Sequence, residues 1–271
     1  MPELPEVETT CRGIRPFMAG QRLAAWQVRE PRLRWPIDMA WPGQVAGQLV
    51  TQITRRSKYI IVHLEHGQLL AHLGMSGQFR VLPDPSLAPA KHDHCDWVMA
   101  DGTVIRYRDP RRFGAMLWTP NWEQHPLIVN LGPEPLSDDF SGAALHAACQ
   151  KRTSPIKSAI MDAHLVVGVG NIYANEALFM AGIHPLRRAN RISRARCEGL
   201  AEAIKTVLTR AIAQGGTTLR DYVSAQGESG YFRIELQAYG RAGLPCVQCK
   251  TPLLEKRLSG RSTVYCKHCQ H

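Results

Sequence analysis

The sequence lacks the features that mark membrane and secreted proteins. It contains no run of about 18 apolar residues, the length that a bilayer-spanning helix requires. Its N-terminus lacks the basic stretch followed by an apolar stretch that defines a signal peptide. Internal repeats and low-complexity tracts are also absent from the sequence. We therefore expect a globular, monomeric, cytoplasmic protein without a membrane partner.

Acidic residues are fewer than basic ones, and the deficit lies in the second half of the chain. Lys and Arg number 33 against 23 Asp and Glu, which gives a net charge of +10. Residues 1–135 hold 15 basic and 13 acidic side chains, whereas residues 136–271 hold 18 and 10. Such an excess of positive charge predicts a polyanionic partner. We expect the second half to contribute much of a nucleic-acid-binding surface.

The first 118 residues change their hydrophobic period once. Apolar residues from Leu4 to Ile14 recur at helical spacing and predict an amphipathic helix that ends before Pro16. From residue 21 onward, segments with period two lie between turn signals, and Asp101-Gly102 is a hairpin sequence. The expected strands are Val45–Ile53, Tyr59–Leu64, Gln68–Leu73, Gln78–Leu82, Trp97–Ala100, Val104–Tyr107 and Ala115–Trp118. Strands at this spacing predict a β-sandwich.

A Pro/Gly-rich segment, residues 131–136, marks the change from period two to helical period. The expected helices span residues 141–151, 155–162, 171–181 and 194–213, with Ser154 as an N-cap and Gly182 as a C-cap. The small polar segment Ser224–Gly230 is expected to be mobile. We therefore predict an α+β chain of four parts: residues 1–130, a linker over 131–150, a helical domain over 151–235 and a tail domain over 236–271.

Four of the eight cysteines cluster in the tail as two Cys-x2-Cys pairs separated by sixteen residues. The ligands would be Cys246, Cys249, Cys266 and Cys269. This spacing predicts a four-thiolate zinc ribbon, a closed structural site that holds one Zn²⁺ and leaves no position for catalysis. Basic residues between the pairs, such as Arg261, would then lie on a rigid finger, or would be no more than solvated charges.

The N-terminal residues Met1-Pro2-Glu3 offer a nucleophile beside a carboxyl group. Removal of Met1 would leave Pro2 with a free secondary amine, whose pKa near 7.7–8.0 keeps a useful fraction unprotonated at neutral pH. A secondary amine condenses with an aldehyde carbon to a cationic iminium, and Glu3 could act in general acid–base catalysis. The same residues also suit a helix start, since Pro5 and Glu6 are favoured in a first turn.

Two loops carry further candidates. Arg111 and Phe113 lie in Asp109–Gly114 between two expected strands, where an exposed guanidinium and aromatic ring could enter a base stack left by a flipped nucleotide. The alternative is a bulged edge with Phe113 in the core. Met75 is by default a core residue. The glycine-bearing segment that precedes Asn171 could approach a phosphate or could be a tight connection between helices.

Lys58 follows two arginines at the start of an expected strand. It could contact a phosphate or could be an edge-strand charge.

Taken together, the N-terminal string, His72–Gly77, Asp109–Gly114, Val166–Glu176 and the four-cysteine tail resemble the formamidopyrimidine-DNA glycosylases. The resemblance covers essentially the whole chain. It implies a bifunctional glycosylase and abasic-site lyase that excises oxidised purines, such as 8-oxoguanine and formamidopyrimidines, from double-stranded DNA in base excision repair. It also implies a β-sandwich catalytic domain, a helical DNA-binding domain with a helix-two-turns-helix, and a zinc-finger β-hairpin.

The resemblance implies a role for each matching residue. Pro2 would form the Schiff base and Glu3 would donate a proton, whereas Lys58 would serve β-elimination and Arg261 δ-elimination. The trio that would fill the void in the duplex is Met75, Arg111 and Phe113. The phosphate or DNA contacts would be His92, Arg152 and Asn171. Residues 224–230 match the loop that would fold over the damaged base.

Two other functions fit part of the pattern. A sister family that excises oxidised pyrimidines shares Pro2, Glu3 and the zinc site, but it typically has Gly where this chain has Leu4. A non-catalytic zinc protein that senses lesions would need neither a free Pro2 nor Glu3.

Overall fold

The computed structural model describes residues 2–82, 86–215 and 236–271, and they divide into two compact units. One unit contains residues 2–129, and the other contains residues 130–214 together with 236–271. The Ser224–Gly230 segment, which we expect to be mobile, lies outside the described residues. In the described part of the chain, no helix is both long enough and apolar enough to cross a bilayer.

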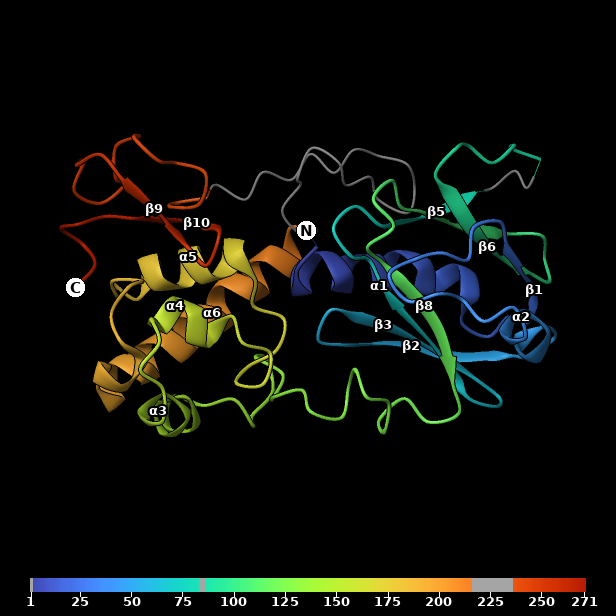
Figure 1. Cartoon of the computed structure of the whole chain (residues 1–271), viewed down its shortest axis with the longest axis horizontal. Helices are drawn as coiled ribbons and strands as arrows, with labels where there is room; N and C mark the ends of the chain where they lie inside the picture. The colour runs from blue at the N-terminus through green and yellow to red at the C-terminus, as the bar shows by residue number, and fades with distance from the viewer. Residues whose placement is uncertain (1, 83–85, 216–235) are drawn as a thin grey trace. The chain divides into compact units, whose positions relative to one another are not determined.

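The first unit is a sandwich of two antiparallel four-stranded sheets (Figure 1). One sheet has the order β1 (Leu23–Val28), β6 (Asp93–Met99), β7 (Val104–Arg108), β5 (Gln78–Leu82). The other has the order β2 (Val50–Arg56), β3 (Tyr59–Leu64), β4 (Gln68–His72), β8 (Ala115–Thr119). The predicted sandwich is therefore confirmed, and Asp101-Gly102 forms the expected hairpin between β6 and β7 with Gly102 at φ 89°.

Helix α1 (Leu4–Met18) packs against β2 and β3 of one sheet and β5 of the other. Its inward residues, from Val7 to Met18, belong to the sandwich core. The prediction that the helix ends before Pro16 is wrong, because Pro16 lies inside its last turn. Met18 is completely buried, and this burial favours continuation of the helix past the proline.

The sequence pattern misplaced several parts of the sandwich. The expected strand start at Trp97 is wrong, because β6 begins at Asp93. Strand β1 was not expected, because a register shift between Leu23 and Ala25 breaks the alternation that predicts a strand. The expected strand start at Val45 is also wrong. Val45 ends the short helix α2 (Trp41–Val45), and β2 begins at Val50.

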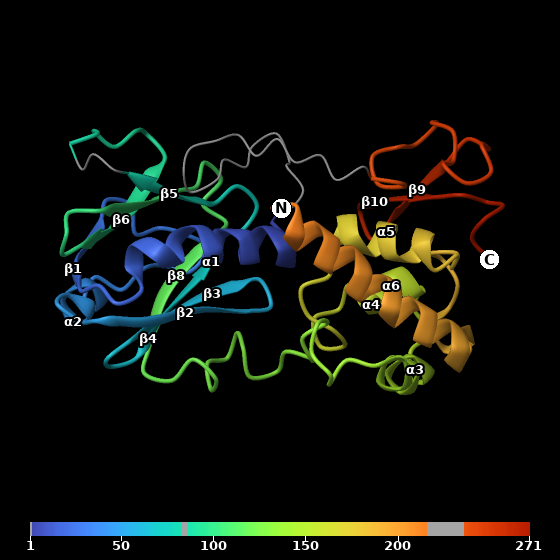
Figure 2. The same ribbon diagram turned by 180° about the vertical axis from the view of Figure 1, so that it is seen from behind.

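The second unit contains four α-helices in its described part (Figure 2). They are α3 (Gly142–Gln150), α4 (Ile156–Ile160), α5 (Asn171–Met180) and α6 (Arg194–Ala213), with a 3-10 turn η1 (Ala189–Arg191). Helix α6 packs against both α3 and α5. The expected helices are confirmed within a few residues, but Pro155 rather than Ser154 is the N-cap of α4. Gly182, at φ 65°, lies one position after the α5 C-cap Ala181.

The tail folds as a hairpin of β9 (Leu254–Leu258) and β10 (Arg261–Tyr265). Ser259 and Gly260 connect the strands with φ 50° and 75°, as a two-residue hairpin turn with positive φ at both positions requires. Its small core includes Leu253, Val264 and the α5 side chain Phe179, so the hairpin is fixed to the helical unit.

Candidate active site and metal centre

The N-terminal residues form a fixed helix start. Pro2 is buried, and Glu3 and Glu6 are each 2% exposed. Glu3 is the N-cap of α1 and forms a capping box with Glu6, whose carboxylate accepts the Glu3 N–H at 2.8 Å. The helix-start interpretation therefore holds for Glu6. The same contact fixes the backbone that carries Pro2 and Glu3, so the two candidate catalytic residues have a defined direction.

Lys58 lies in the turn between β2 and β3, directly after the buried Ser57, whose φ is 56°. The turn is close to the end of β4, because Tyr59 pairs with His72 across the sheet. Burial and the positive charge of Lys58 lower the pKa of His72 to about 4. The His72 Nδ1 atom accepts the Gly74 N–H at 3.0 Å, as a neutral imidazole can.

His72 is thus a residue beside Lys58 that sequence reasoning did not single out. Its signal is its place at the start of the His72–Gly77 motif, where Leu73 separates it from the Gly-Met-Ser-Gly segment.

Two loops of the sandwich present the predicted void-filling side chains. We call residues 74–77 the first loop and residues 109–114 the second loop. Met75 is 41% exposed and Phe113 is 45% exposed, so the alternative that places them in the core is wrong. The Arg111 guanidinium carbon lies 4.9 Å from the Phe113 ring centroid, in cation–π contact.

His92 lies in the turn that precedes β6 and is half-buried. Its ring centroid is 6.4 Å from that of His94, and its carbonyl accepts the N–H of Asp109 at 3.0 Å. The structure therefore places His92 beside the base of the second loop.

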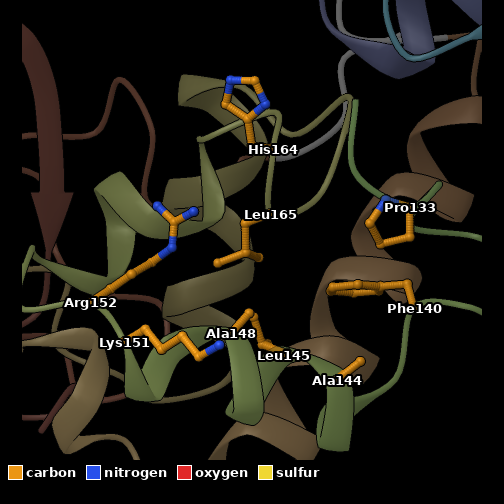
Figure 3. A pocket seen from close by; sticks show the side chains of 9 residues that line it. All are labelled: Pro133, Phe140, Ala144, Leu145, Ala148, Lys151, Arg152, His164 and Leu165. Carbon is orange, nitrogen blue, oxygen red and sulfur yellow. The ribbon is translucent and has the colours of Figure 1, made fainter. Parts of the chain in front are cut away.

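Arg152 follows α3 in the helical unit and already has a partner. Its guanidinium lies 2.6 Å from the Asp162 carboxylate. Burial raises the pKa of Asp162, but the His164 N–H and Arg152 more than offset this and hold the pKa below its usual range. Arg152 and His164 also line a cavity of about 650 Å³ over apolar residues such as Leu165 (Figure 3).

The hairpin is docked on the helices by two buried polar residues. The Lys157 side chain, 1% exposed, donates to the Ser262 carbonyl at 2.7 Å and to the Thr263 hydroxyl at 2.8 Å. Asn175 accepts the Val264 N–H at 2.8 Å. Sequence reasoning missed Lys157 and Asn175, because each lies on a helix far along the chain from the hairpin.

Asn171 and Arg261 are brought into the same unit by this docking. Asn171 is the first residue of α5, after the N-cap Gly170, so the predicted glycine-bearing segment does lead into a helix. Arg261 is exposed directly after the hairpin turn, at the start of β10. The finger thus holds a cation at its tip.

The four tail cysteines are brought together as a metal site would need. All are free thiols, and their sulfur atoms lie within 4.8 Å of one another. The Cys246–Cys269 and Cys249–Cys266 sulfur pairs are 3.9 and 3.4 Å apart. A tetrahedron with bonds of about 2.3 Å to zinc places its sulfur atoms about 3.8 Å apart. The donor set therefore fits one structural Zn²⁺.

Comparison with family models covers most of the chain. The model described as "Formamidopyrimidine-DNA glycosylase N-terminal domain" matches residues 1–116. The model described as "Formamidopyrimidine-DNA glycosylase H2TH domain" matches residues 131–223. A third, "Zinc finger found in FPG and IleRS", matches residues 243–271, which include all four tail cysteines.

Comparison with individual proteins gives full-length matches. Proteins named formamidopyrimidine-DNA glycosylase from Marinobacter nauticus and Escherichia coli are 54% and 53% identical over 270 residues, which cover 100% of each chain. The crystal structure of MutM (Fpg) from Thermus thermophilus has a TM-score of 0.88 at 37% identity and covers 99% of this chain and 98% of that one. The Lactococcus lactis Fpg in complex with DNA containing an abasic site has a TM-score of 0.91 at 32% identity, with 99% of both chains covered.

Proposed function

The chain belongs to the formamidopyrimidine-DNA glycosylase family, and from this premise we propose which of its residues carry the reaction. The protein is a DNA glycosylase and abasic-site lyase that acts on damaged DNA in base excision repair, with one structural zinc ion. We propose that its substrates are oxidised purines in duplex DNA and that Pro2 is the nucleophile.

The observation that carries this proposal is the fixed start of α1. The capping box between Glu3 and Glu6 holds the backbone that carries Pro2. Once Met1 is removed, the secondary amine of Pro2 attacks C1′ of the damaged nucleotide. A nitrogen–carbon bond forms there as the glycosidic bond breaks, and the base leaves with its electron pair and a proton. Glu3 protonates the ring oxygen as the sugar opens.

The iminium at C1′ then acts as the electron sink for strand cleavage. It acidifies the C2′ protons, and loss of one proton expels the 3′ phosphate by β-elimination. We assign Lys58 to this step, because it lies in the turn between β2 and β3, close to His72 at the end of β4. Loss of a C4′ proton expels the 5′ phosphate by δ-elimination, and we assign Arg261 on the finger to it. Water releases the sugar fragment from Pro2.

The remaining site residues bind DNA or support its binding. Met75, Arg111 and Phe113 fill the void left by the extruded nucleotide, and their exposure supports this role. His92, Arg152 and Asn171 contact the DNA backbone, although Arg152 must share its charge with Asp162. The four cysteines hold Zn²⁺, which supplies rigidity to the finger.

The expected domain organisation and cellular location complete the proposed function. Residues 1–130 form the catalytic domain, residues 131–150 the linker, residues 151–235 the DNA-binding helical domain and residues 236–271 the zinc finger. The enzyme works in the cytoplasm on nucleoid DNA.

Borohydride trapping tests the nucleophile. The protein is incubated with a duplex that contains 8-oxoguanine opposite cytosine, and borohydride then reduces the iminium to a stable amine. Peptide mapping should locate the adduct on Pro2, and mass spectrometry should find Met1 absent. Pro2→Gly should lose most of the adduct and of strand cleavage, whereas Pro5→Ala, in the same segment, should retain both. An adduct on another residue, or full cleavage by protein that retains Met1, would refute the assignment.

A further inference from the structure

We infer that Asp109 is the positioning residue that sets how Met75, Arg111 and Phe113 are presented to DNA. This inference rests on the proposed role of that trio in filling the void in the duplex. It gives Asp109 control over extrusion of the damaged base, the step that precedes the chemistry at Pro2.

One carboxylate oxygen of Asp109 joins the first loop to the second. Asp109 is completely buried. Its Oδ1 atom accepts the Ser76 hydroxyl at 2.6 Å and the Arg111 N–H at 3.3 Å. The same Arg111 N–H lies 3.2 Å from the Ser76 oxygen, so these three groups close a triangle. The backbone of Arg111 is therefore fixed against the residue that follows Met75.

The other oxygen fixes the far end of the second loop. Oδ2 of Asp109 accepts the Gly114 N–H at 2.8 Å and the Tyr107 hydroxyl at 3.2 Å. Burial, together with the charge of Asp109, raises the pKa of Tyr107 well above its usual value, so the phenol remains a donor. Gly114 directly follows Phe113. The carboxylate thus holds the backbone beside each member of the trio.

The two loops meet with no room to adjust. A Cβ atom on Gly74 would lie 2.4 Å from the carbonyl carbon of Phe113. A Cβ atom on Gly114 would lie 1.8 Å from the Tyr107 hydroxyl oxygen. Backbone therefore contacts backbone, and the hydrogen bonds to Asp109 set the spacing. Arg112, at φ 54°, lies in the left-handed region inside the same loop.

The charge of the carboxylate is essential to this arrangement. A carboxylate offers only acceptors, and all four groups that face Asp109 are donors. Asn at this position keeps only one acceptor oxygen, so its amide group faces either the Arg111 N–H or the Gly114 N–H. Two donors then face each other in the second loop, and one end of that loop loses its link to Asp109. Hydrogen bonds to charged groups are the stronger class, so the loops lose much of their fixed spacing.

Weaker presentation of the trio should affect two substrates to different extents. A lesion paired with cytosine must be extruded, and the trio must replace the stacking and pairing that are lost. An abasic site has no base to extrude, so its cleavage depends less on void filling. Weaker presentation of the trio should therefore slow excision of 8-oxoguanine more than cleavage at an abasic site.

The experiment compares kcat/KM on 8-oxoguanine opposite cytosine with kcat/KM on an abasic site opposite cytosine. Asp109→Asn should lower kcat/KM on 8-oxoguanine by about 30-fold and kcat/KM on the abasic site by about 3-fold. Each factor of 10 corresponds to about 1.4 kcal/mol. Ser76→Ala, which removes one corner of the triangle, should lower the ratio of the two by about 3-fold. A 2-aminopurine placed beside the lesion should show a smaller fluorescence rise for both variants than for the wild type.

Tyr107→Phe is the matched control, because it removes one donor to Oδ2 of Asp109 and leaves the Ser76, Arg111 and Gly114 donors in place. It should lower thermal stability and leave the substrate ratio within about 2-fold of wild type. An unchanged ratio for both Asp109→Asn and Ser76→Ala overturns the inference. Ser76→Ala decides the question alone if Asp109→Asn does not fold. Failure of the wild type to form the Pro2 adduct would instead refute the proposed function, so the two failures can be told apart.

Discussion

The β-sandwich and the zinc finger fix their exposed site residues by different means. The sandwich has a large apolar core, and its loops are held by buried hydrogen bonds such as those of Asp109. The finger has a small apolar core that includes Leu253 and Val264, and it relies on four thiolates and on contacts from Lys157 and Asn175. A small core cannot fix a hairpin by burial alone, so metal ligation must supply the difference.

This difference predicts that catalytic activity and DNA affinity can be lost separately. Glu3→Gln should reduce excision of 8-oxoguanine by about 1,000-fold, because it removes a proton donor whose contribution is typically 100- to 10,000-fold. Duplex affinity, measured by anisotropy, should stay within about 2-fold, because Gln can still cap α1. Glu8→Gln is the control, since Glu8 pairs with Arg12 and Arg55 rather than with the site. A large loss of affinity for Glu3→Gln would contradict the separation.

Loss of the metal should instead reduce DNA affinity while the sandwich stays folded. Cys249→Ser should release zinc and weaken binding to damaged duplex by about 30-fold or more, because the finger folds around the ion. The sandwich should remain folded, as Trp97 in its core can report by fluorescence. Cys95→Ser changes a buried sandwich cysteine and should leave the zinc content intact. Unchanged affinity after zinc loss would show that the finger takes no part in binding.

Substitution of Lys157 tests whether the finger also depends on its hydrogen bonds to the helices. Lys157→Met fills the same space but removes the donor to the Thr263 hydroxyl and leaves the Ser262 carbonyl with only a long contact of 3.5 Å from the Asn175 amide. The helical unit should lose about 2–3 kcal/mol of stability, the usual cost of buried groups left without partners. Urea denaturation of the zinc-loaded protein measures this change, with Lys205→Met, at a partly exposed position of α6, as the control. An equal effect of the two variants would show that the docking contacts are dispensable.

The last expected effect is a pH dependence of the stability of the sandwich. The pKa of His72 is about 4 in the folded protein, because burial and Lys58 disfavour its charged form, against about 6.5 when unfolded. The unfolded chain therefore binds more protons between these pH values. The contribution of His72 is complete above about pH 6.5 and is lost toward pH 4, by at most about 1.4 kcal/mol per pH unit. His72→Gln should reduce this slope in urea denaturation between pH 7 and 5.

The sequence predicted the elements better than the contacts between them. Period two located β3, β4, β5, β7 and β8 closely, because each strand alternates or is flanked by turn residues, but it missed the first four residues of β6. Cysteine spacing alone predicted the metal ligands. A bulge concealed β1, since it breaks the alternation at Leu23. Asp109, Lys157 and Asn175 could not be given their roles, because their partners depend on tertiary folding rather than on local pattern.

The C-terminal residues Gln270 and His271 are part of the finger rather than an appendage. The Gln270 side chain accepts the Cys266 N–H at 2.8 Å and donates to the Ile183 carbonyl at 2.9 Å, and the His271 backbone bonds to Gly182 and His184. A product trimmed by two residues would retain every thiol and bind the ion in a mass spectrum. It would nevertheless have lost the tether between the metal loop and the end of α5. Metal content alone is therefore a poor quality test for recombinant preparations.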